Sequence, residues 1–179
     1  AQKDYSIWSG GYWLWKAPEY LLVTHIAQEI APSFGSSGSW YLTLEHGAKQ
    51  ALKEAGATGK GKLHKKIRAN GRFDLLFWWG GDKPRAPIEV KRQVSQFKQI
   101  KADVDRIEKV IQRKKESSRF QFGMVTFFMS SKAKSNDMAK ANLEARLKAI
   151  RGGLNDHLAE NTKFKIRKTR VRTGEDSAW

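Results

Sequence analysis

Residues 73–92 read FDLLFWWGGDKPRAPIEVKR, which is the pattern of two strands joined by a turn. The first part, 73–79, is rich in the aromatic and aliphatic residues that strands favour. Glycine, aspartate and proline at 80–84 supply turn chemistry, and an extended pattern resumes at 86–92. The segment therefore predicts a β-hairpin.

The charged residues of this hairpin are predicted to share one face. Side chains alternate between the faces of a strand, so Asp74 points the same way as Leu76, and Glu89 the same way as Lys91. If the hairpin closes symmetrically about its turn, Asp74 lies opposite Lys91, and Leu76 lies opposite Glu89. We therefore expect Asp74, Glu89 and Lys91 to form a cluster that is backed by an apolar face.

Two interpretations of this cluster are open from the residues alone. A solvated sheet face with one cross-strand ion pair would have the same composition. Against it, Leu76 and Trp78 share the charged face, which indicates a mostly covered strand where buried charges are costly. The other interpretation is a metal site, because two carboxylates can bind a hard cation such as Mg2+. Such an ion lowers the pKa of a bound water and neutralises phosphodiester charge, while a neighbouring ammonium group stabilises the transition state.

The spacing of Asp74, fourteen residues and then Glu89-Val90-Lys91 resembles the motif of the PD-(D/E)XK nuclease superfamily. Phe73 stands where that motif has its proline, which is the loosest part of the pattern. The resemblance implies an α/β, restriction-endonuclease-like core with a central mixed sheet of four to five strands flanked by helices. It implies that Asp74, Glu89 and the Val90 carbonyl hold Mg2+, for which Mn2+ substitutes, and that Lys91 is the catalytic lysine. The implied activity is Mg2+-dependent hydrolysis of DNA phosphodiester bonds, as an endonuclease.

Periodicity and turn residues predict the elements around the hairpin. In chain order they are helices at 17–31 and 43–55, a strand at 63–67 followed by a tight turn at 70–71, a helix at 95–116, a buried strand at 120–129, a helix from Asn136, and a basic strand at 163–172. This order agrees with the superfamily core, which has a helix, three antiparallel strands, a helix and a fourth strand.

All 179 residues are expected to form one nuclease-like domain, since a chain of this length can bury a sizeable core. Its expected parts are an aromatic N-terminal lid at 1–16, two helices at 17–55, the core with the metal site at 60–129, and a C-terminal helix and basic strand at 136–172.

A further acid is expected beside the metal, because superfamily members often carry a glutamate on the helix before the first core strand. Glu45, near the start of the 43–55 helix, is the candidate, and Glu19 and Glu29 on the earlier helix are alternatives. An ordinary first-turn carboxylate that faces the helix dipole explains Glu45 equally well.

The chain carries 34 Lys and Arg against 18 Asp and Glu, a formal charge of +16, which favours a polyanionic partner. We expect nucleic acid, and DNA rather than RNA, to contact two basic segments. The residues expected to make these contacts are Lys62, Lys65, Lys66, Arg68, Lys165, Arg167 and Arg170. The 95–116 helix is expected to point its basic residues outward, Arg106 among them.

The composition excludes several classes of site. Cysteine is absent, so disulfides, zinc–thiolate sites and cysteine nucleophiles are ruled out. No apolar run is long enough to span a membrane, and a cytoplasmic or nucleoid-associated location is expected. A homodimer is compatible with the resemblance, since double-strand cleavage by this fold commonly uses two active sites.

Two other functions fit parts of the sequence. A non-catalytic nucleic-acid-binding protein on the same fold is the main alternative, in which the acid pair and the lysine would be coincidental. An RNA-binding or scaffold protein would explain the charge but would leave Asp74, Glu89 and Lys91 without a role.

Overall fold

The computed structural model places the chain in two compact units. The first unit comprises residues 1–90 and 102–126, and the second comprises residues 91–101 and 127–179. The single nuclease-like domain expected for the whole chain therefore stays a prediction. The residues that the structure describes are 2–34, 39–114, 116–158, 164–165, 167, 173–174 and 177–178.

A four-stranded sheet, in the order β1-β2-β3-β4, organises the first unit. Its strands are β1 (Trp40–Gly47), β2 (Arg72–Trp79), β3 (Pro84–Lys91) and β4 (Met124–Phe127). β1 pairs antiparallel with β2, and β2 pairs antiparallel with β3. The hairpin predicted from residues 73–92 is thereby confirmed.

β4 runs parallel to β3. The amide of Gln121 donates to the Arg85 carbonyl and the amide of Phe128 donates to the Lys91 carbonyl, so both chains advance in the same direction. Parallel neighbours need a crossover connection, which α4 (Lys101–Gln112) provides. The α/β class and the mixed sheet flanked by helices, both predicted from the sequence, are confirmed.

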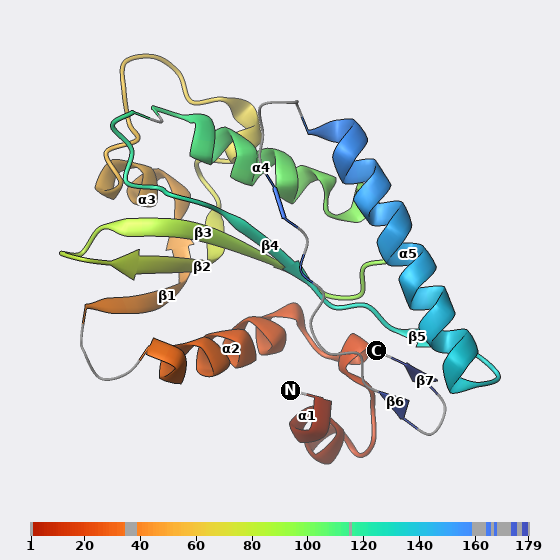
Figure 1. The fold of residues 1–179 in the computed structure, drawn as a ribbon. Helices are drawn as coiled ribbons and strands as arrows, with labels where there is room; N and C mark the ends of the chain where they lie inside the picture. Colours follow the sequence, from red (N-terminus) through yellow and green to blue (C-terminus); the bar gives the residue numbers. More distant parts are fainter. Residues whose placement is uncertain are drawn as a thin grey trace. The chain divides into compact units, whose positions relative to one another are not determined.

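Helices cover both faces of this sheet (Figure 1). α2 (Glu19–Ile30) lies on one face, where Val23 packs with Leu75, Ile88 and Val90. The helix predicted at this place is confirmed. Its apolar residues recur at helical spacing and meet the residues of β2 and β3 that point to this side.

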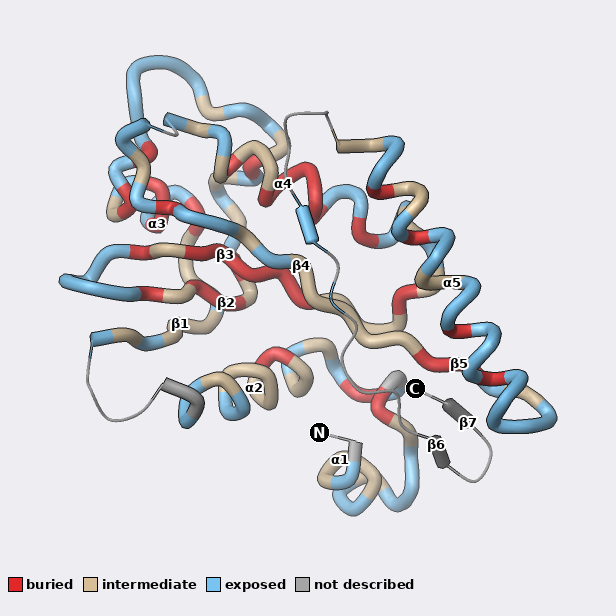
Figure 2. The backbone as a smooth tube through the Cα atoms, viewed as in Figure 1, coloured by how far each residue is buried: buried red, intermediate tan, exposed pale blue. Residues whose placement is uncertain are grey.

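α3 (Ala48–Glu54) and α4 cover the opposite face. Leu52 of α3 and Val110 of α4 are buried with Leu76 and Trp78 of β2. Because both faces of β2 are covered, its sequence is a nearly continuous apolar run instead of an alternating one. Figure 2 shows the resulting band of buried residues along β2 and β3.

β1 occupies much of the helix that was expected at 43–55, so that prediction is wrong in its first part. Residues 40–47 pair with β2, and the helix starts only at Ala48. Apolar residues recur with the two-residue period of a strand at Trp40, Leu42 and Leu44. The prediction of a helix at 43–55 does not take this alternation into account.

The strand predicted at 63–67 is also wrong, because Lys65–Ile67 forms a 3-10 turn, η3. The ring of His64 accepts a hydrogen bond from the Lys66 amide and closes this turn. β1 takes the place of the expected first strand. The first strand of the sheet therefore precedes α3, whereas the sequence predicted it to follow the helix at this place.

The hairpin closes two residues away from the register that symmetric closure predicts. Leu76 pairs with Pro87 and not with Glu89. Three consecutive loop residues, 80–82, adopt positive φ and tighten the turn, so fewer residues are left in the loop. Because the shift is even, Asp74 keeps its predicted face.

The helix predicted at 95–116 is shorter in the structure. A 3-10 turn, η4 (Phe97–Gln99), precedes α4, which ends at Gln112. Arg106, expected on the outer face of this helix, is only 2% exposed.

The second unit contains α5 and a small sheet. α5 (Asn136–His157) lies where a helix was predicted, but its N-cap is Ser135 and not Asn136, because the Ser135 side chain accepts a hydrogen bond from the Met138 amide. The small sheet has the order β5-β7-β6, formed by Ser131–Lys132, Ser177–Ala178 and Thr173–Gly174. Of the basic strand predicted at 163–172, residues 164, 165 and 167 are described and the rest, with Arg170, lies outside the described residues.

Short helical elements complete the first unit: α1 (Gln2–Ser9) and the 3-10 turns η1 (Leu14–Lys16) and η2 (Ala31–Phe34). Within the predicted aromatic lid, Trp8 and Tyr12 are 67% and 62% exposed. No helix in the described part of the chain combines the length and the hydropathy needed to cross a bilayer.

Gly123 marks a close approach between the segment before β4 and α4. A Cβ atom at this position would overlap the Ile107 side chain and lie 3.5 Å from Ile111 Cγ1. We therefore expect Gly123→Ala to lower the free energy of unfolding by about 1–3 kcal/mol, measured by urea denaturation. Gly152→Ala, in α5, is the control, because a Cβ atom there would meet no atom within 4 Å. Equal stability of the two variants would contradict this packing.

Candidate active site

Asp74 and Glu89 lie across from each other on adjacent strands. β2 and β3 pair Leu75 with Ile88, and one further step along this register places Asp74 opposite Glu89. Oδ2 of Asp74 accepts a hydrogen bond from the Val90 amide at 2.7 Å, which holds the Asp74 side chain against β3. The two acids that the sequence predicts to share a site are therefore neighbours.

The Glu89 carboxylate is buried in an ion pair. Glu89 is 3% exposed, and its Oε1 lies 2.5 Å from Nη1 of Arg106. A second guanidinium, that of Arg68, lies 3.7 Å from the same oxygen. Burial of either charge alone would be strongly unfavourable, so Glu89 and Arg106 each depend on the other for a stable buried position.

Arg106 also ties the site to the chain segment before β2. Its Nε donates to the Ile67 carbonyl at 3.0 Å, and its Nη1 donates to the Arg72 carbonyl at 2.8 Å. The guanidinium lies 4.4 Å from the centre of the Phe73 ring, a cation–π contact. One side chain of α4 therefore holds η3, the start of β2 and Glu89 of β3 together.

Two acidic residues of α4 hold the basic segment that precedes β2. Oδ1 of Asp103 accepts a hydrogen bond from Nη2 of Arg68 at 2.7 Å, and Oδ2 of Asp105 lies 3.0 Å from Nζ of Lys66. Both acids are buried. Lys66 and Arg68, which the sequence predicts to contact nucleic acid, therefore have their charges partly neutralised within the protein.

The surroundings of Glu89 favour its neutral form. Burial raises the pKa of Glu89 to about 7, the Arg106 guanidinium opposes this rise, and Asp74 and Asp103 add to it. Burial lowers the pKa of Arg106, and Glu89 opposes that change. Three carboxylates thus face two guanidinium groups, those of Arg106 and Arg68.

The donor atoms of the acid pair suit a hard divalent cation. Asp74 and Glu89 each use one oxygen, Oδ2 and Oε1, in the contacts described above. Their second oxygens, Oδ1 and Oε2, have no hydrogen-bond partner in the described part of the chain. Carboxylate oxygens are the ligands that Mg2+ prefers, with water in the remaining positions. Among the described residues, no three acidic, histidine or cysteine side chains are arranged to hold a metal ion.

Glu45 lies on β1 and not in the first turn of a helix, so that part of its prediction is wrong. The residue pairs on both sides of it in the β1–β2 ladder place it across from Asp74. Its φ is 52°, which is uncommon outside glycine, and its side chain is exposed. The alternatives Glu19 and Glu29 lie on α2, which covers the face of the sheet opposite to Arg106.

Val90 and Lys91 complete β3. The Val90 side chain is buried among the residues that face α2, while its amide binds Asp74. Lys91 is the last residue of β3 and the first of the second unit. It follows Glu89 by two residues, so strand alternation gives the two side chains the same side of the strand.

The remaining residues predicted to contact nucleic acid are exposed where the structure describes them. Lys62 and Lys65 are exposed in the first unit, and Lys165 and Arg167 are exposed in the second.

The interpretation of the sequence missed Arg106 and Asp103 as parts of the site. Residues 103–107 of α4 are all buried, so this helix has no simple outer face on which a charged residue must lie. The topology of the sheet could have indicated them, because a helix that connects β3 to a parallel β4 must cross the sheet. Its charged residues can then meet the acids of the strands.

No family model, curated protein or solved structure matches this chain. The chemistry assigned to the site therefore rests on its own residues.

The raised pKa of Glu89 predicts a pH-dependent stability. Between the ordinary value of 4.5 and about 7, the folded protein binds more protons at Glu89 than the unfolded chain does, so stability falls as pH rises through this range. The loss is about 3 kcal/mol at most. Glu89→Gln keeps an acceptor for Arg106 and removes the titration, so the difference in unfolding free energy between pH of about 5 and about 8 should shrink.

Urea denaturation at the two pH values measures this difference. The matched control is Glu116→Gln, since Glu116 is exposed and should leave the pH dependence of the wild type unchanged. An identical pH dependence in Glu89→Gln and in the wild type would contradict the assignment.

Proposed function

We propose that the protein is a metal-dependent nuclease that hydrolyses DNA phosphodiester bonds with a PD-(D/E)XK-type site. The observation that carries the proposal is the position of Asp74 across from Glu89 on adjacent strands, with Lys91 two residues beyond Glu89. The sheet supports it, because three antiparallel strands, β1 to β3, are followed by the crossover helix α4 and a fourth strand, β4, although α3 stands between β1 and β2.

Each residue of the site has a task in this proposal. Asp74 Oδ1, Glu89 Oε2 and the Val90 carbonyl are the ligands offered to Mg2+, which Mn2+ can replace. The bound ion would polarise the phosphodiester and lower the pKa of the attacking water. The Val90 amide and the Arg106 guanidinium hold the two carboxylates in place. The ammonium group of Lys91 supplies positive charge to the transition state.

DNA is the proposed substrate, and its backbone is the part that the protein binds. The formal charge of +16 favours a polyanion, and contacts to phosphates position a strand without specifying its sequence. A cytoplasmic or nucleoid-associated location follows from such a substrate. A homodimer would let two sites cut the two strands.

A non-catalytic nucleic-acid-binding protein is the second candidate, and one observation favours it. Arg106 and Arg68 both contact Oε1 of Glu89. A buried carboxylate that only stabilises the fold would need the same cationic partners. In that function the acid pair stabilises the fold and the basic surface alone acts on nucleic acid.

Cleavage of supercoiled plasmid and of labelled single strands, with Mg2+, Mn2+ or EDTA, separates the two candidates. Asp74→Asn keeps an acceptor for the Val90 amide and removes the charge, so it should abolish cleavage while the protein stays folded. Lys91→Met should lower the rate by about a hundredfold or more. The control Glu116→Gln, at an exposed position, should cleave like the wild type.

Binding measured in EDTA completes the comparison. Asp74→Asn should bind DNA at least as tightly as the wild type, because it removes a negative charge. Salt-sensitive binding by a wild type that cleaves nothing with either metal would reject the nuclease and leave the binding protein.

A further inference from the structure

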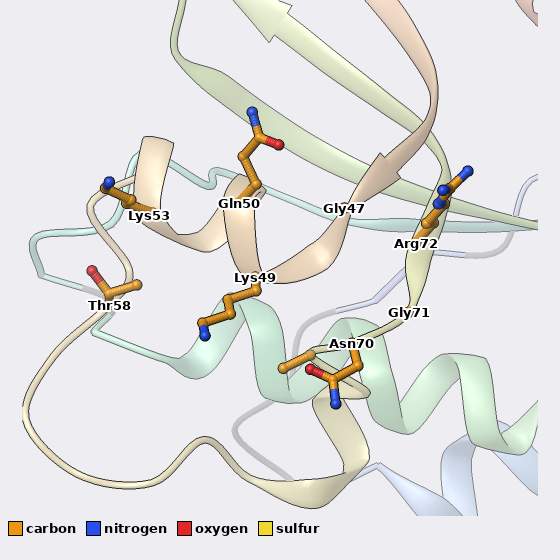
Figure 3. Close-up of a pocket in the computed structure, with 9 residues that line it drawn as sticks. Gly47, Lys49, Gln50, Lys53, Thr58, Asn70, Gly71 and Arg72 are labelled. Carbon is orange, nitrogen blue, oxygen red and sulfur yellow. The ribbon is translucent and has the colours of Figure 1, made fainter.

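A basic pocket lies beside the start of β2 in the first unit (Figure 3). It has a volume of about 650 Å³, and α3 and the segment that leads into β2 form its two main walls. The residues that carry its chemistry are Lys49, Gln50, Lys53, Thr58, Asn70 and Arg72. In the view of Figure 3, the Lys49 side chain lies between those of Thr58 and Asn70.

The two walls of this pocket are joined by backbone hydrogen bonds. The Ala48 amide donates to the Gly71 carbonyl at 2.9 Å, and the Lys49 amide donates to the Ala69 carbonyl at 3.1 Å. These bonds use the first amides of α3, so the positive charge of the pocket comes from side chains and not from a helix terminus. Arg106 donates a hydrogen bond to the Arg72 carbonyl, which holds the second wall in place. The pocket is therefore formed before any partner arrives.

The side chains that line the pocket carry positive charges and no negative charge. Lys49, Lys53 and Arg72 line it, and none of its lining residues is acidic. In the described part of the chain these three side chains have no ion-pair partner. Lys66 and Arg68 differ, since Asp105 and Asp103 pair with them. The positive charge favours an anion, and the Asn70 amide and the Thr58 hydroxyl can donate hydrogen bonds to it, while the Gln50 amide already donates to Glu54.

The surroundings favour a chain of phosphates over a single anion. The loop between α3 and β2 also exposes Lys60, Lys62 and Lys65, which extends the basic surface from the pocket. Arg72 precedes Asp74 by two residues on β2, a separation of about 7 Å along a strand. A strand seated in the pocket would therefore pass close to the acid pair.

We infer that this pocket binds the sugar–phosphate backbone of a DNA strand and seats the substrate next to Asp74. The role of the pocket in seating a substrate rests on the proposed nuclease function. The binding of phosphates rests on the positive charges of Lys49, Lys53 and Arg72. Because it uses phosphate contacts, the binding should be independent of sequence and should weaken steeply with salt.

The test measures binding of a labelled single strand and of a duplex, each of about 20 nucleotides, by fluorescence anisotropy in EDTA over about 50 to 200 mM salt. The variant is Lys49→Glu. Lys49 is the second residue of α3, where a glutamate is favourable for the helix, so the fold should be kept. The matched control is Lys83→Glu, which makes the same charge change at an exposed residue of the β2–β3 loop, beyond the other end of β2.

We expect Lys49→Glu to weaken binding roughly tenfold at about 100 mM salt and to lower the slope of log K against log salt by about one. Lys83→Glu should change affinity much less. Lys53→Gln should weaken binding in the same direction as Lys49→Glu. Equal effects of Lys49→Glu and Lys83→Glu would overturn the inference, since net charge alone would then explain binding.

The same proteins distinguish this inference from the proposed nuclease. Weaker binding by Lys49→Glu together with no cleavage by the wild type supports the pocket and rejects the nuclease. Metal-dependent cleavage that needs Asp74, with unchanged binding by Lys49→Glu, supports the nuclease and rejects the pocket. Inorganic phosphate should not displace the labelled oligonucleotide when both are present at similar concentrations. Displacement under these conditions would indicate a site for a single anion and would also reject a backbone site.

Discussion

The buried ion pair between Arg106 and Glu89 is the constraint on which the rest of the first unit depends. A guanidinium that is 2% exposed must find acceptors for its donors, and Arg106 finds them in Glu89, in the Ile67 carbonyl and in the Arg72 carbonyl. These acceptors belong to β3, to η3 and to β2. Through Arg106, α4 is therefore tied to three separate segments of the chain. The same contacts hold the acid pair and one wall of the basic pocket.

Local patterns were sufficient to predict the hairpin and the approach of Asp74 to Glu89. The turn residues and the alternation of residues 73–92 fix which side chains share a face, and a register error of two residues leaves that face unchanged. The length of the turn was not predictable in the same way, because it depends on positive φ values at 80–82 that a non-glycine residue also adopts. The same local patterns predict the α/β class, but they misplace the first strand, because β1 precedes α3 where the sequence indicated only a helix.

Contacts that join distant parts of the chain could not be predicted from spacing. Arg106 lies on a helix with many other basic residues, and only the fold places Glu89, 17 residues earlier, against it. Lys66 and Arg68 look like solvent-facing charges in the sequence, yet buried acids of α4 pair with both. The neighbours of Glu45 also fit a helical period, which predicts a helix, whereas the pairing of β1 with β2 places Glu45 in a strand. In each case tertiary contacts override a local preference.

A structural role and a catalytic role for Glu89 are compatible. A metal ligand must be ionised, and burial alone pushes Glu89 towards its neutral form. Arg106 opposes that shift, so the guanidinium that stabilises the fold also keeps a larger fraction of Glu89 ionised at neutral pH. It does so through Oε1 and leaves Oε2 to a further ligand. In the proposed nuclease, binding of a divalent cation would then favour the ionised carboxylate further, and metal affinity should be coupled to the loss of a proton from Glu89. Arg106 is in this sense a positioning residue, because it sets both the orientation and the charge of the acid that the metal needs.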